Sequence, residues 1–80
     1  MKENIQKIKE EDLKKLAKRI RMLRQGKCYS NYEDFAYVND LPRAQYGRYE
    51  KGEDLKFSSL MKVIRALDVS IKEFFSDGFE

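Results

Sequence analysis

The 80-residue chain has no histidine, no tryptophan and a single cysteine, Cys28. Without a second cysteine an intramolecular disulfide is impossible, and without histidine the usual Cys/His zinc sites are excluded. We also find no Gly-rich phosphate loop and no nucleophile spaced from a base as catalysis requires. The sequence therefore predicts no metal, no other cofactor and no enzyme.

Long apolar runs are missing as well. The N-terminus is polar, and no stretch approaches the roughly 18 apolar residues that a membrane helix needs. We expect neither a signal peptide nor a membrane span, and we expect the protein in a reducing cytoplasm. In that setting Cys28 is predicted to be a small hydrophobe packed at a loop edge, with redox sensing as the alternative.

Proline occurs once and glycine four times, while charged residues make up 39% and hydrophobic residues 41% of the chain. This composition is typical of one small folded domain. Its charge is uneven, because residues 1–27 carry a net charge of +6 and residues 28–80 one of −3. A basic half suits a polyanion such as DNA, and the alternative is a solvated lysine-rich helix face.

Apolar residues recur at helical spacing, and no stretch alternates with the period of a strand. We expect five helices: over residues 11–25, 32–38 and 42–50, then one capped by Ser58 or Ser59, and a short one opened by Ser70. Ser30 or Asn31 is expected to cap the second helix. Residues 1–10 are expected to form an arm or a helix extension, residues 11–76 the domain, and residues 77–80 a tail.

The segment YEDFAYVNDLPRAQYGRYEKG, residues 32–52, reads as two short helices joined by a tight corner at Asn39 and Asp40. This is the build of a helix-turn-helix, whose second helix lies in the DNA major groove. Its apolar residues are spaced to face the body of the protein. The outer side is then left to Arg43, Ala44, Gly47, Arg48 and Lys51.

Arginine forks suit this outer side because they can donate two hydrogen bonds to guanine, and the methyl group of Ala44 can contact a thymine methyl. The alternative is a solvated helix face without a ligand. Tyr46 and Tyr49 also raise the possibility that a tyrosine hydroxyl emerges from the core and touches the DNA backbone.

The chain resembles the Cro-repressor-type, or XRE-like, helix-turn-helix regulators over roughly residues 13–75. The resemblance rests on these segments and residues in this order: LAKRIRMLR, Phe35-Ala36, Leu41, Arg48-Tyr49-Glu50-Lys51-Gly52 and ALDVSIKEFF. It implies an all-α, five-helix, lambda-repressor-like DNA-binding domain. It also implies a partly buried ion pair between Arg24 and Glu50.

Carried over position by position, the resemblance assigns base reading to Arg43, Ala44, Gly47 and Arg48. Phosphate contacts are assigned to Lys51 and to the start of the second helix, at Asn31 or Tyr32. The implied function is a transcriptional regulator, either a repressor or an autoregulatory controller, that binds operator DNA. The alternative is an antitoxin or another protein-interaction module.

The C-terminus is rich in large apolar groups, namely Ile71, Phe74, Phe75 and Phe79. We expect these residues to form a symmetric homodimer interface, since two copies would present two recognition helices to DNA half-sites. The alternative is that they close the core of a single chain.

Overall fold

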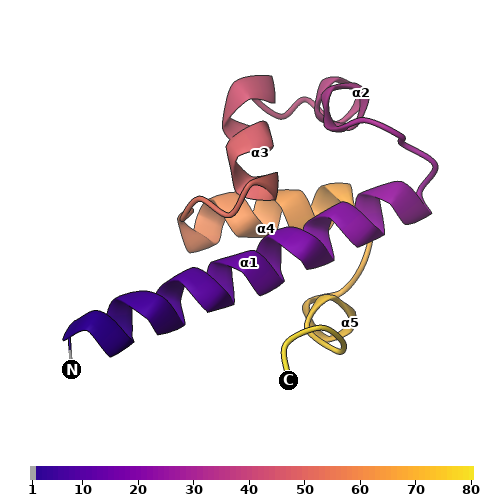
Figure 1. Cartoon of the computed structure of the whole chain (residues 1–80). Coiled ribbons are helices and arrows are strands. Elements are labelled where there is room, and N and C mark those ends of the chain that lie inside the picture. The colour runs from indigo at the N-terminus through magenta and orange to yellow at the C-terminus, as the bar shows by residue number, and fades with distance from the viewer. Residues whose placement is uncertain (1) are drawn as a thin grey trace.

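The computed structural model describes the backbone of residues 2–80 and the side chains of residues 5–80, and this part of the chain contains helices but no strand. The helices are α1 (Lys2–Gly26), α2 (Tyr32–Val38), α3 (Arg43–Glu50), α4 (Phe57–Ala66) and α5 (Ile71–Phe74). The predicted five-helix, all-α class is confirmed. Figure 1 shows the long α1 crossing the molecule, with α2 and α3 on one side of it and α5 on the other.

Helix α1 begins far earlier than the expected residue 11, because it is continuous from Lys2. Of the two alternatives for residues 1–10, the helix extension is confirmed from residue 2 onward; Met1 lies outside the described residues. Along the extension Gln6 donates to Glu10 at 3.4 Å, and Lys9 forms an exposed ion pair with Asp54 at 3.3 Å.

Just beyond the end of α1, Cys28 takes a left-handed backbone conformation with φ 70° and is exposed. The predicted packing of this side chain is therefore wrong. Cys28 is an exposed thiol on a turn, and the sequence holds no second cysteine with which it could form a disulfide within the chain.

Side chains cap two of the short helices. The Asn31 side chain accepts from the backbone N–H of Asp34 at 2.8 Å, so Asn31 and not Ser30 caps α2. Ser70 caps α5 as expected, accepting from the N–H of Glu73 at 3.0 Å. The expectation for α4 is wrong, because this helix begins at Phe57, ahead of both candidate serines.

The core is formed where α2, α3, α4 and α5 meet the inner face of α1. Its largest fully buried side chains are Ile20, Phe35, Tyr46, Val63, Ile64, Leu67 and Phe74. The rings of Phe35 and Tyr46 lie 5.3 Å apart, which joins α2 to α3. Aromatic packing of this kind adds about 0.5–1.5 kcal/mol to the burial of the rings.

Helix α5 completes the core of the single chain. Phe74 is fully buried, which corrects its assignment to a dimer interface: its ring closes the core from the α5 side. Arg19 donates to the carbonyl oxygens of Phe74 at 2.8 Å and Glu73 at 2.9 Å, which satisfies the end of this helix. Phe79 is half-buried against the ring of Phe74 at 6.0 Å. Residues 77–80 are thus not a free tail.

Arg24 and Glu50 form the expected ion pair, which ties α1 to the last turn of α3. Arg24 Nε lies 2.9 Å from Glu50 Oε2, and Arg24 Nη2 lies 2.7 Å from Glu50 Oε1, so the contact is bidentate. Both residues are 5% exposed. Arg24 also donates to the carbonyl of Tyr29 at 2.9 Å. The hydrogen bonds to Glu50 raise the pKa of Arg24, although burial opposes them.

We expect Arg24→Met to lower the free energy of unfolding by about 3–5 kcal/mol, because it leaves the Glu50 carboxylate buried without a partner. Urea denaturation measures this loss. Lys18→Met, at an exposed position of the same helix, is the matched control and should change stability little. Equal effects of the two substitutions would contradict a stabilising role for the pair.

Tyr46 lies beside this pair and is 1% exposed, so it faces the core as its spacing predicts, and its hydroxyl does not emerge toward DNA. Its hydroxyl is buried and has no hydrogen-bond partner among the described residues. Burial raises the pKa of Tyr46 well above its ordinary value of 10.0. The nearby Glu50 carboxylate raises that pKa further, acting electrostatically without the geometry of a hydrogen bond.

We expect Tyr46→Phe to raise the free energy of unfolding by about 1 kcal/mol at neutral pH, because it removes a buried polar group without a partner. The gain should grow above pH 10 or so. There the unfolded tyrosine ionises while the folded one, with its raised pKa, does not, so the wild type loses stability that the variant keeps. Urea titrations at neutral pH and at about pH 10.5 test this; a loss of stability in the variant would contradict it.

Candidate nucleic-acid interface

Helices α2 and α3 form a compact corner. Figure 1 shows α2 end-on while α3 lies in the plane of the view, so the two helices cross steeply. Asp40 makes the turn with a left-handed φ of 56°, as expected for this position. The N–H of Leu41 then donates to the carbonyl of Ala36 at 2.8 Å. Ala36 is fully buried, and its small side chain permits the close contact between the helices.

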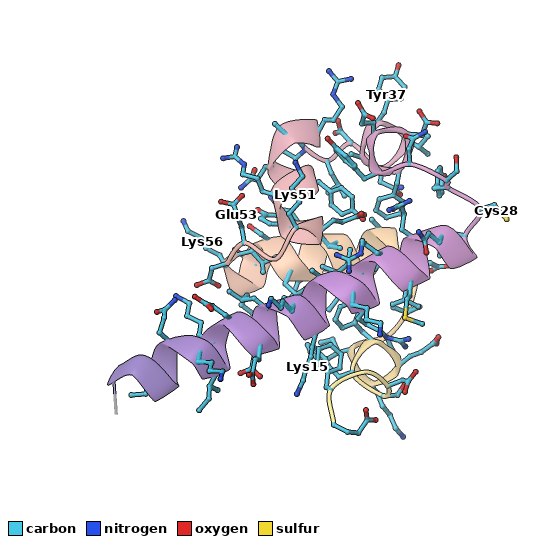
Figure 2. All side chains as sticks on the ribbon, in the orientation of Figure 1. Lys15, Cys28, Tyr37, Lys51, Glu53 and Lys56 are labelled. Atoms are coloured by element: carbon cyan, nitrogen blue, oxygen red, sulfur yellow. The ribbon has the colours of Figure 1, made fainter. Side chains whose placement is uncertain are left out.

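The side of α3 that faces away from the core carries four of the five residues expected there. Arg43, Ala44, Arg48 and Lys51 are all exposed. Arg48 lies 3.8 Å from Glu53, which follows the helix, and its side chain is 60% exposed. Surface pairs of this kind contribute about 0–1 kcal/mol, so the guanidinium can exchange Glu53 for another partner at little cost. Figure 2 shows Lys51, Glu53 and Lys56 along this part of the surface.

Gly47 does not lie on the open side, contrary to expectation. It is buried under the ring of Tyr32 from α2, and a Cβ added at Gly47 would stand 2.8 Å from Tyr32 Cε2. The glycine therefore permits close packing of α2 on α3. Its assignment to base reading is wrong in this structure, because the ring covers the backbone that would approach a base.

The two candidates for the phosphate contact have different surroundings. Asn31 is exposed, but its side chain caps α2 and also donates to the Asp34 carboxylate at 3.2 Å. Tyr32 is half-buried and its ring lies on Gly47. Glu33 and Asp34 place negative charge in the first turn of α2, which disfavours a phosphate there. Lys51 follows the end of α3 and forms no ion pair with an acidic side chain among the described residues.

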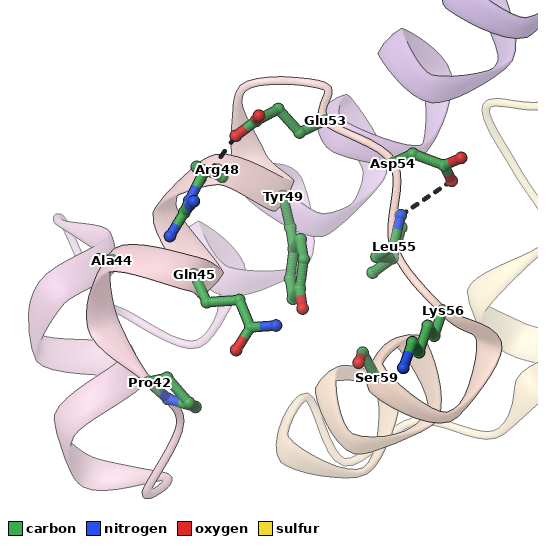
Figure 3. A pocket seen from close by; sticks show the side chains of 10 residues that line it. All are labelled: Pro42, Ala44, Gln45, Arg48, Tyr49, Glu53, Asp54, Leu55, Lys56 and Ser59. Carbon is green, nitrogen blue, oxygen red and sulfur yellow. Dashed lines mark hydrogen bonds and ion pairs between the residues drawn. The ribbon is translucent and has the colours of Figure 1, made fainter.

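A groove of about 590 Å³ runs between α3 and the start of α4 (Figure 3). Gln45, Ala44 and Arg48 form its α3 side, and Lys56 and Ser59 lie across from them. Tyr49 is half-buried in the groove, between these two sides. Sequence reasoning missed Gln45, although its helical spacing from Tyr49 and Arg48 places it on the same flank.

Other kinds of site have no support in the described residues. No group of three or more acidic, cysteine or histidine residues gathers where a metal ion could be held. None of the helices described is long and apolar enough to cross a membrane. Comparisons of the chain with protein-family models, curated proteins and solved structures find no match.

Proposed function

We propose that the protein is a sequence-specific DNA-binding transcriptional regulator that places α3 in the major groove of operator DNA. The observation that carries the proposal is the exposed side of α3, which α2 packs against at a steep angle: it carries two arginines and a small residue, and a lysine follows the helix directly. A helix about 10–12 Å across fits a groove about 12 Å wide. Occupying promoter DNA would then repress transcription or control the protein's own gene.

Each exposed group has a task suited to its chemistry. Arg43 and Arg48 would read guanine through two hydrogen bonds each, and Ala44 would contact a thymine methyl. Lys51 would bind a phosphate, which fixes register without reading sequence. The positive charge of α1 adds a non-specific attraction to the polyanion.

The proposed regulator is a homodimer whose interface is smaller than the sequence suggests. Phe74 belongs to the core, but Ile71, which begins α5, is 47% exposed, and Phe75, which follows α5, is 42% exposed. These two side chains form the remaining apolar patch at α5. A two-fold axis through this patch would present two copies of α3 to half-sites about one helical turn apart.

Alanine substitutions separate base reading from phosphate contact. We expect Arg43→Ala or Arg48→Ala to relax the preference at one defined base pair per half-site, at a cost of about 1–3 kcal/mol in binding. Lys51→Ala should weaken binding to all sequences and lower the salt slope by about one. Arg65→Ala, at an exposed position of α4 outside this side of α3, is the control.

Site selection from a random duplex library, followed by titration of the selected and scrambled duplexes, measures these effects. Uniform weakening by all three α3 substitutions would contradict the base-reading roles. Absence of any selected sequence for the wild type would contradict the proposed function. If the protein is instead an antitoxin-like interaction module, both arginine variants should still bind its protein partner.

For the dimer, we expect the wild type to sediment as a dimer at micromolar concentration and Ile71→Ser to shift it to a monomer. Ile71 begins α5 and is half exposed, so the substitution should leave the thermal midpoint nearly unchanged. Tyr37→Ser removes a more exposed apolar group from α2 and is the control. A monomeric wild type, or an unchanged dimer in Ile71→Ser, would contradict the α5 interface.

A further inference from the structure

The open side of α3 is turned relative to the arrangement that sequence spacing predicts. At 3.6 residues per turn, five residues follow one another around the helix in the order Gly47, Lys51, Ala44, Arg48 and Gln45. The ring of Tyr32 closes the Gly47 flank. The groove beside α4 opens the opposite flank, where Gln45 lies. The exposed side is therefore centred on Ala44 and Arg48, and Gln45 is at its open edge.

Gln45 is free to act at this edge. It is exposed, and its side-chain amide makes no hydrogen bond to another described residue. Figure 3 shows it beside Ala44 and Arg48 on α3, across the groove from Ser59 and Lys56. Among the described residues this amide caps neither α3 nor α4.

We propose that Gln45 is a specificity-determining residue that reads an adenine next to the bases contacted by Ala44 and Arg48. A glutamine amide can accept from adenine N6 and donate to adenine N7 at once, a pairing that no other base offers in the major groove. This inference depends on the proposed DNA-binding function. It replaces Gly47 with Gln45 among the base-reading positions.

Substitutions at Gln45 test the assignment through the identity of the base. From the wild type, site selection should return an adenine at one position of each half-site. Gln45→Ala should lose roughly 5- to 150-fold of the discrimination at that position and keep it elsewhere. Gln45→Glu should shift the preference there from adenine to cytosine, because a carboxylate accepts from cytosine N4. Gln25→Ala, the same change in the last turn of α1, is the matched control.

The possible outcomes separate this inference from the function on which it depends. If the wild type selects an operator and both Gln45 variants keep the same preference at every position, the role of Gln45 is overturned while DNA binding stands. If the wild type selects no sequence, DNA binding and the role of Gln45 both fail. Thermal midpoints of the variants equal to that of the wild type ensure that changes in preference do not reflect unfolding.

Discussion

The buried pair between Arg24 and Glu50 fixes how α3 is presented. Glu50 is in the last turn of α3, and both oxygens of its carboxylate are held by one guanidinium from α1. Its carbonyl oxygen accepts from Arg21, so α1 holds the backbone of this turn as well. Removing either charged partner would leave the other buried without compensation, which is far costlier than losing a surface pair. The end of α3 therefore has one position on α1.

The remaining freedom of α3, its rotation about its own axis, is limited by two aromatic contacts. Tyr46 points into the core against Phe35, and the ring of Tyr32 lies on Gly47. These contacts close two flanks of α3 along most of its length, and Arg43, which lies between them around the helix, is exposed in the first turn. Recognition requires exposed side chains that a rigid scaffold holds in position, and α3 provides them. The groove toward α4 extends this side to Gln45.

Much of this could be predicted from the sequence. Helical spacing indicated the first and fourth helices, capping and turn residues indicated the second, third and fifth, and the family resemblance implied the Arg24–Glu50 pair. Periodicity alone could not give the covering of Gly47, because it identifies the side that a helix buries and not a ring that reaches over from its neighbour. Phe74 could not be separated from Ile71 and Phe75 either, since all three are apolar and only the packing of α5 decides which is inside.

The most direct measurement of the central claim follows backbone amide chemical shifts of labelled protein during titration with a duplex that carries the selected operator. We predict that the largest changes fall in α3 and in the residues just after it, with smaller ones at the start of α2, and that α5 shows changes only where it meets a second copy. Largest changes confined to α5 or to the N-terminal part of α1, with α3 unaffected, would contradict the account.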